Sequence, residues 1–159
     1  MLKNLQDLFH PKSVCIIGAS RSLEKVGGII LKNIINSKFT GKIYPVNPNT
    51  QSIDDLPCFP NLESLPEIPD LAIIAIPASL VINELEQIGK KGIKNVVVLT
   101  AGFKEIGIDG DKLQKDLIEI SKKYNLNLLG PNCMGFINNA LPINATFGQP
   151  VNQLCNLRF

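Results

Sequence analysis

The residues best suited to chemistry in this sequence are small and polar residues that follow apolar runs. The run at 14–17 ends at Gly18, and a polar loop with Ser20, Arg21 and Lys25 comes next. Small residues let a backbone approach an anion closely, and the free N–H groups and positive dipole end of a following helix favour negative charge. This stretch therefore predicts a phosphate-facing loop between a buried strand and a helix.

Four more apolar runs end in turns of the same kind. These turns contain small, proline or amide residues, and they are Asn47-Pro48-Asn49, Ile76-Pro77-Ala78, Thr100-Ala101-Gly102 and Gly130-Pro131-Asn132. None of them holds a histidine or a nucleophile beside a base, so we expect ligand binding and no catalytic residue. Cys133 is interpreted as a plain buried thiol. His10, the single histidine, precedes Pro11, and we expect it to have a surface or capping role.

The elements that must position these turns alternate between strands and helices. Apolar runs predict strands at 14–17, 42–46, 70–76, 95–100 and 127–129. Helical spacing predicts helices at 27–35, 78–91 and 111–124, after a short lead-in helix within 1–12. Four prolines at 50–69 predict short turns, and 136–147 is expected to be extended or a hairpin. The whole pattern predicts an α/β fold, a Rossmann-like doubly wound parallel sheet in a single domain, with all five turns at one edge.

Composition excludes several classes of function. No apolar run reaches the length of a membrane span, and the N-terminus lacks the apolar core of a signal peptide. A net charge of +2 without basic runs does not indicate nucleic-acid binding. The four cysteines are scattered without a CxxC pair, which predicts reduced thiols, a cytoplasmic protein and no bound metal.

The glycine loop differs from the common nucleotide motifs. After Gly18 the next glycines are Gly27 and Gly28, too late for G-x-G-x-x-G, and the strand at 42–46 ends in Asn47 without a carboxylate for a ribose. The Walker pattern is also absent. The loop therefore suits phosphates while NAD is disfavoured, and a strand end without an acid tolerates a nucleotide phosphorylated on its ribose.

From about residue 8 to residue 147 the chain resembles the CoA-binding domain of the NDP-forming acyl-CoA synthetases. This family includes ADP-forming acetyl-CoA synthetase and the α subunit of succinyl-CoA synthetase. The segments that carry the resemblance are IIGAS with KVGG, IYPVNPN, DLAIIAIPASLV, VVVLTAGFKEIG and LLGPNCMGFIN. Their order and their positions at the strand ends make the resemblance specific, and the ADP-forming acetyl-CoA synthetases are the nearest group.

The resemblance also implies which residues bind coenzyme A (CoA). The loop Gly18, Ala19, Ser20 and Arg21 matches the family's phosphate loop, and Arg21 and Lys25 stand at the mouth of the helix that follows. The other matching segments are Asn47, Pro48 and Asn49 beside the adenosine, Pro77 and Ala78 along the adenine or pantetheine path, Leu99, Thr100 and Ala101 in a further CoA contact, and the Gly130–Cys133 loop with Asn132 facing the reaction centre. Several members carry a lysine near position 49 or 50, which this chain lacks.

The resemblance implies that residues 1–148 form a CoA-binding module and that 149–159 are a divergent or truncated tail. The full enzyme would interconvert acyl-CoA, ADP and phosphate with acid, CoA and ATP, using an ATP-grasp partner and a phosphohistidine in a later domain. The chain by itself is then a non-catalytic fragment. One alternative is an NAD(H)-binding redox-sensor domain, although residues 1–12 are too short and not basic enough for the DNA-binding segment that it needs. Another is a structural remnant that binds nothing.

Overall fold

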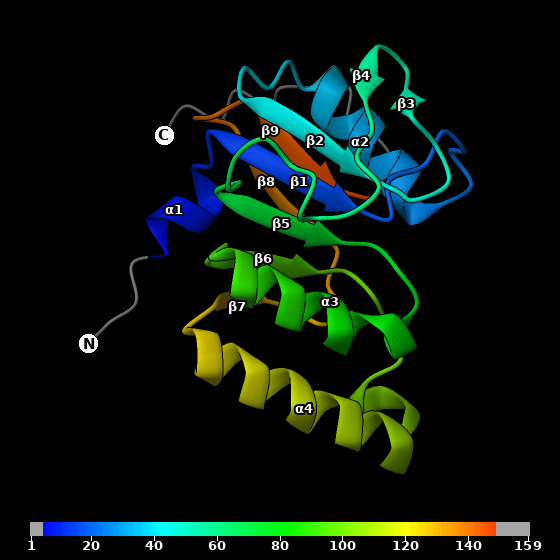
Figure 1. Ribbon diagram of the computed structural model, residues 1–159, viewed down its shortest axis with the longest axis vertical. Coiled ribbons are helices and arrows are strands. Elements are labelled where there is room, and N and C mark those ends of the chain that lie inside the picture. Colours follow the sequence, from blue (N-terminus) through cyan, green and yellow to red (C-terminus); the bar gives the residue numbers. More distant parts are fainter. Residues whose placement is uncertain (1–4, 149–159) are drawn as a thin grey trace, which may run out of the picture.

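The computed structural model describes residues 5–148, and its centre is a five-stranded parallel sheet (Figure 1). The five strands lie in the order β2-β1-β5-β6-β7. Their bounds are β1 (Ser13–Ile17), β2 (Lys42–Val46), β5 (Leu71–Ile74), β6 (Asn95–Val98) and β7 (Asn127–Leu129). The chain starts in the interior at β1, runs outward to β2, and then returns to β5 on the other side. The doubly wound sheet is therefore confirmed, with its switch point between β1 and β5.

The inner strands are buried on both faces, as their continuous apolar runs predict. Every residue of β1, β5 and β6 is buried. Alternate residues of β1 belong to two separate cores: Val14 and Ile16 face one, and Cys15 and Ile17 face the other. Strand β2 lies at one edge of the sheet, where Pro45 is tolerated because an edge strand can lack a ladder hydrogen bond.

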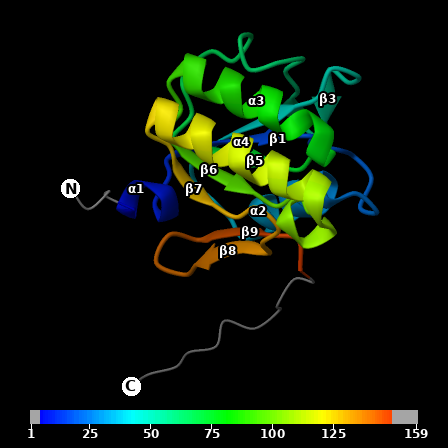
Figure 2. The same ribbon diagram turned by 90° about the horizontal axis from the view of Figure 1, so that it is seen from below.

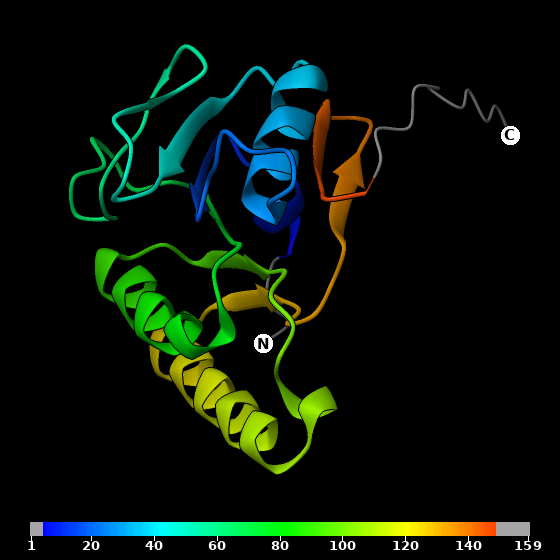
Figure 3. The ribbon, with the colours of Figure 1, turned by 90° about the vertical axis from the view of Figure 1, so that its right-hand side faces the viewer.

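Helices cover both faces of the sheet (Figures 2 and 3). Helices α3 (Ala78–Lys91) and α4 (Ile108–Tyr124) lie side by side on one face. Helix α2 (Val26–Asn36) covers the other face together with the hairpin of β8 (Gly135–Asn138) and β9 (Ile143–Thr146). The hairpin is fixed to α2 by buried Asn33, whose Nδ2 donates to the carbonyl oxygens of Thr146 at 2.8 Å and Gly148 at 3.1 Å.

The connection from β2 to β5 is the crossover without a helix. It contains a small antiparallel hairpin of β3 (Ser52–Ile53) and β4 (Leu56–Pro57), followed by turns. Phe59 then runs beside the outer side of β2, where it forms an isolated parallel bridge with Val46. The prediction of short turns and no long element at 50–69 is confirmed.

Most predicted elements match the structure closely. The helix at 78–91 and the strands at 42–46 and 127–129 have the predicted bounds, and 136–147 forms a hairpin. The strands predicted at 70–76 and 95–100 end earlier, because their last residues belong to the turns. Helix α4 begins at Ile108 and not at 111, since Asp109 already sits in its first turn, where a carboxylate favours the dipole. The lead-in helix is only α1 (Gln6–Phe9); the first four residues and the tail at 149–159 lie outside the described residues.

Candidate functional site

The five strand-end turns lie at one edge of the sheet and are joined by hydrogen bonds. Gly18 N–H donates to the Val46 carbonyl at 3.0 Å, which joins the ends of β1 and β2. Ala75 N–H donates to the Ile17 carbonyl at 2.9 Å, which joins β5 to β1. The Thr100 hydroxyl donates to the Ile76 carbonyl at 2.7 Å. Asn132 N–H donates to the Thr100 carbonyl at 3.0 Å. The predicted convergence of the five turns is therefore observed.

The glycines of the first loop allow the backbone to pack without side chains. Gly18 has a φ of +88°, and a Cβ there would lie 2.4 Å from the Ala75 carbonyl oxygen. Gly27, in the first turn of α2, lies so close that a Cβ would approach the Gly18 carbonyl oxygen to 1.9 Å. The loop between them leaves the sheet and returns, so Gly27 provides the close helix–strand contact that the dinucleotide fingerprint obtains from a nearer glycine.

Two helices begin at this edge without a side-chain cap. Helix α2 starts after Lys25 and helix α3 after Pro77, and neither residue makes a capping hydrogen bond with its side chain. The first N–H groups of a helix have no intrahelical acceptor, so an uncapped start presents donors and a positive dipole to a ligand. Lys25 and Pro77 are exposed. The edge can therefore receive an anion at the start of α2, where Lys25 adds positive charge.

The end of β2 is organised by Asn47. Its Nδ2 donates to the Ala19 carbonyl at 2.8 Å, and its Oδ1 accepts from Asn49 N–H at 2.9 Å. A carboxylate at this position could accept but not donate, so it could not hold the loop in this way. Ala19 is buried. The Ser20 hydroxyl caps the turn, because its Oγ accepts a hydrogen bond from Ser22 N–H at 3.1 Å. Pro48 and Asn49 are exposed beside the loop.

The turns after β5 and β6 contribute shape more than charge. Ala78 is partly buried and Ala101 is exposed, whereas the side chain of Leu99 is buried in the core, so only its backbone is available to a ligand. The Glu105 carboxylate accepts from Gly102 N–H at 2.6 Å, and this hydrogen bond lowers the pKa of the carboxyl group. The negative charge of Glu105 makes the β6 turn less suited to phosphate than the glycine loop.

The last turn contains Asn132, which is exposed and has a φ of +53°. Next to it, the Cys133 thiol donates to the Val98 carbonyl with an S···O distance of 3.4 Å. Burial raises the pKa of the Cys133 thiol, which disfavours the nucleophilic thiolate. Cys133 is half-buried rather than fully buried, and the plain-thiol interpretation agrees with these contacts. Among residues 5–148, no group of three or more His, Cys, Asp or Glu side chains is placed to hold a metal ion.

Sequence reasoning missed the part of the site beyond the glycine loop. The Arg21 side chain does not lie free but reaches the β3–β4 hairpin, where Nε and Nη2 donate to the Ser52 carbonyl at 3.1 and 2.7 Å. Behind it lies a cavity of about 160 Å³ whose walls include Ser20, Lys32 and Asp54. The hairpin consists of two-residue strands in a proline-rich segment, a pattern that gives no periodic signal to read.

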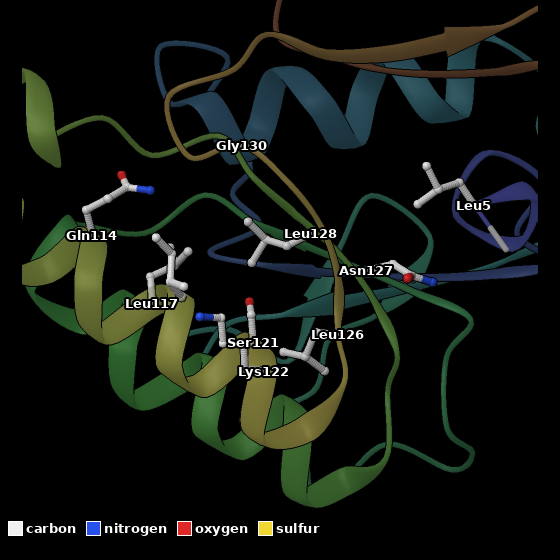
Figure 4. Close-up of a pocket in the computed structure, with 10 residues that line it drawn as sticks. Leu5, Gln114, Leu117, Ser121, Lys122, Leu126, Asn127, Leu128 and Gly130 are labelled. Atoms are coloured by element: carbon white, nitrogen blue, oxygen red, sulfur yellow. The ribbon is translucent and has the colours of Figure 1, made fainter. Parts of the chain in front are cut away.

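Another hollow, of about 330 Å³, runs between α4 and the outer strand β7 (Figure 4). Its walls include Leu117, Leu126 and Leu128, and it meets the strand-end turns only at Gly130. The walls are mainly apolar, although Lys122 also lines them, and the hollow lies away from the glycine loop, so it is separate from the candidate site. No helix within residues 5–148 is both long and apolar enough to cross a bilayer.

The fold and this edge define the class of doubly wound α/β domains that bind ligands at a switch point. Residues 12–139 match the family described as CoA binding domain. The match includes most of the chain, and the protein therefore belongs to this family.

Relatives and solved structures agree with the family. The chain is 46% identical over 145 residues to acetate–CoA ligase [ADP-forming] I of Archaeoglobus fulgidus, a match that covers 91% of the chain and 21% of that protein. It is 40% identical over 149 residues to subunit alpha of acetate–CoA ligase [ADP-forming] I of Pyrococcus furiosus, covering 91% and 32%. Acetyl-coenzyme A synthetase 1 of Ca. Korarchaeum cryptofilum, solved with phosphate and ADP, superimposes with a TM-score of 0.88 at 36% identity, covering 92% and 31%.

The resemblance to the ADP-forming synthetases is confirmed by these relatives, and the redox-sensor alternative is not favoured. The chain spans between about a fifth and a third of the length of the relatives it matches.

Proposed function

We propose that this chain is the module that holds CoA in an ADP-forming acyl-CoA synthetase, with acetate as the acid of the named relatives. Residues 1–148 form the module, and the predicted residues of the strand-end turns contact the ligand. The observation that carries the proposal is the hydrogen-bonded series of five turns beside an uncapped helix. This arrangement supplies backbone donors and small side chains to a phosphorylated ligand near the switch point.

The position of the single histidine supports the proposal that the covalent chemistry takes place in another part of the enzyme. The single histidine, His10, is exposed and lies three residues before β1 begins at Ser13. It therefore lies at the amino edge of the sheet, whereas the glycine loop lies at the carboxyl edge, roughly 16 Å away at about 3.3 Å per strand residue. A phosphohistidine that relays phosphate between acyl phosphate and nucleotide must come from outside this chain. An ATP-grasp domain or subunit in the cytoplasm would complete the reaction of acyl-CoA, ADP and phosphate to acid, CoA and ATP.

Isothermal titration calorimetry with CoA, dephospho-CoA and NAD⁺ tests the proposal. We expect heat of binding with CoA and none with NAD⁺, because Asn47 replaces the carboxylate that a dinucleotide ribose requires. A folded chain that gives no heat with CoA would refute the binding role.

Two substitutions test the assigned cations. Arg21→Ala and Lys25→Ala are each expected to weaken CoA binding about tenfold, because each removes about one charge-assisted hydrogen bond to phosphate. Both side chains are exposed, so the melting temperature should change little, with a small loss for Arg21→Ala from the lost hydrogen bonds to the Ser52 carbonyl. If both variants bind CoA like the wild type, neither residue belongs to the site.

A further inference from the structure

The cavity beyond the glycine loop contains positive charge from two elements. Arg21 reaches it from the loop and Lys32 from helix α2, one turn after Gly28. The β3–β4 hairpin closes the far side with Ile53 and Asp54. Its volume of about 160 Å³ is large enough for a phosphate group.

Arg21 is held in one orientation by the hairpin. Its Nε and Nη2 atoms both donate to the Ser52 carbonyl, at 3.1 and 2.7 Å. Within residues 5–148 the Nη1 group of Arg21 makes no hydrogen bond, so the Nη1 end of the guanidinium retains its donors. An oriented guanidinium with an open end is suited to bind phosphate, because little side-chain entropy remains to be lost.

Lys32 has a weak partner that an anion can displace. Its Nζ lies 3.5 Å from Asp54 Oδ2, and the two side chains are 47% and 52% exposed. An exposed ion pair of this kind contributes little to stability. A phosphomonoester carries close to two negative charges near neutral pH and three acceptor oxygens, so it competes well with a single carboxylate.

We propose that Arg21 and Lys32 bind the phosphomonoester on the ribose of CoA, while the glycine loop and the start of α2 bind its diphosphate. This inference rests on the proposed function and adds the specificity for CoA over dephospho-CoA. CoA carries two separate phosphate groups, and this part of the molecule offers two separate anion sites. The diphosphate suits backbone N–H groups at a helix start, whereas the doubly charged monoester requires side-chain cations.

The main test compares CoA and dephospho-CoA on the whole chain by calorimetry. Lys32→Met removes the charge and keeps a similar stem, so it should weaken CoA about tenfold and leave dephospho-CoA within about twofold. Lys112→Met is the matched control, because Lys112 is an exposed lysine on α4, on the opposite face of the sheet. The control should bind both ligands like the wild type.

A second variant separates a binding role from a structural one. Asp54→Asn removes the carboxylate that competes for Lys32, and Asn tolerates the φ of +49° at this position. We expect CoA to bind about threefold more tightly and dephospho-CoA to bind as before. The reason is that Asp54 no longer competes with the phosphate for Lys32, and the lost ion pair is weak. If the Lys32–Asp54 pair only held the hairpin in place, both ligands would instead bind more weakly.

The outcomes distinguish this inference from the proposed function. A wild-type chain that binds neither ligand refutes both. A wild-type chain that binds CoA and dephospho-CoA equally, or a Lys32→Met variant that weakens both equally, refutes the ribose-phosphate site and leaves the CoA-binding role intact.

Discussion

The two edges of the central sheet use their polar residues in opposite ways. At the amino edge the polar groups pair with one another. Asp70 Oδ2 accepts from Ser13 N–H at 3.0 Å and from the Ser13 hydroxyl at 3.1 Å, and the Asp70 carbonyl accepts from Asn95 Nδ2 at 2.9 Å. Asn127 Nδ2 donates to Asn95 Oδ1 at 2.8 Å, which extends the network to β7. The network connects four neighbouring strands, and its donors are paired with acceptors inside the network.

At the carboxyl edge the polar side chains bind backbone carbonyls instead. The side chain of Asn47 donates to the Ala19 carbonyl, that of Thr100 to the Ile76 carbonyl, and that of Arg21 to the Ser52 carbonyl. These contacts fix the shape of the turns, while the starts of α2 and α3 keep uncapped N–H groups. The comparison indicates that one edge is built for stability and the other for binding, although both contain similar residue types. The predictions below separate these two roles.

The largest effect is expected from Gly27→Ala at the carboxyl edge. The added Cβ would meet the Gly18 carbonyl oxygen at 1.9 Å, so helix α2 must move away from the loop. We expect a loss of about 3 kcal/mol in the free energy of unfolding, measured in urea, and loss of CoA binding. Val26→Ala, one residue earlier and exposed, is the control and should change neither quantity by much. A Gly27→Ala chain that binds CoA normally would contradict the packing argument.

Asp70→Ala tests the amino edge. It leaves two backbone donors and the Ser13 hydroxyl without their acceptor, which should cost about 2 kcal/mol of unfolding free energy. Affinity for CoA, measured on the folded chain, should not change, because the proposed site lies at the other edge. A matching loss of CoA affinity would show that the two edges do not act separately.

Asn47→Asp is expected to affect both properties. The new carboxylate cannot donate to the Ala19 carbonyl and places negative charge beside the glycine loop, where we propose that phosphate binds. We expect about 1 kcal/mol less stability and at least tenfold weaker CoA binding, by urea denaturation and calorimetry. Unchanged CoA affinity would exclude the end of β2 from the site.

The smallest effect is expected from Thr100→Val, which keeps the shape and removes the hydroxyl. Loss of the 2.7 Å bond to the Ile76 carbonyl should lower the free energy of unfolding by about 1 kcal/mol. CoA should bind no more than about threefold more weakly if Thr100 only positions its turn. A much larger loss of affinity would place the hydroxyl in direct contact with the ligand.

The fold was predictable because its strongest signals are local. The run at 70–76 and the helical spacing at 78–91 identify a buried strand and an amphipathic helix without any knowledge of the neighbours. The topology of parallel strands then places all five turns at one edge. The bounds that were wrong, at the start of α4 and the ends of β5 and β6, depend on tertiary contacts in the turns.

The site was predictable in part. The small residues of the turns are visible in the sequence, but the contact between Arg21 and Ser52 joins residues 31 positions apart through an irregular hairpin. In the sequence, Lys32 is indistinguishable from any other exposed charge on a helix. The structure shows that Asp54 lies beside it. The amino-edge network was likewise not predicted, because Asp70 and Asn95 look like ordinary strand-flanking residues.

The crossover without a helix has a consequence for engineering. The β3–β4 hairpin lies outside the five-stranded sheet, so it can be exchanged as a short segment if the buried position of Ile53 stays apolar. Exchanging residues 50–57 between related domains would then change the hairpin partners of Arg21 and Lys32, namely Ser52 and Asp54, without redesigning the sheet.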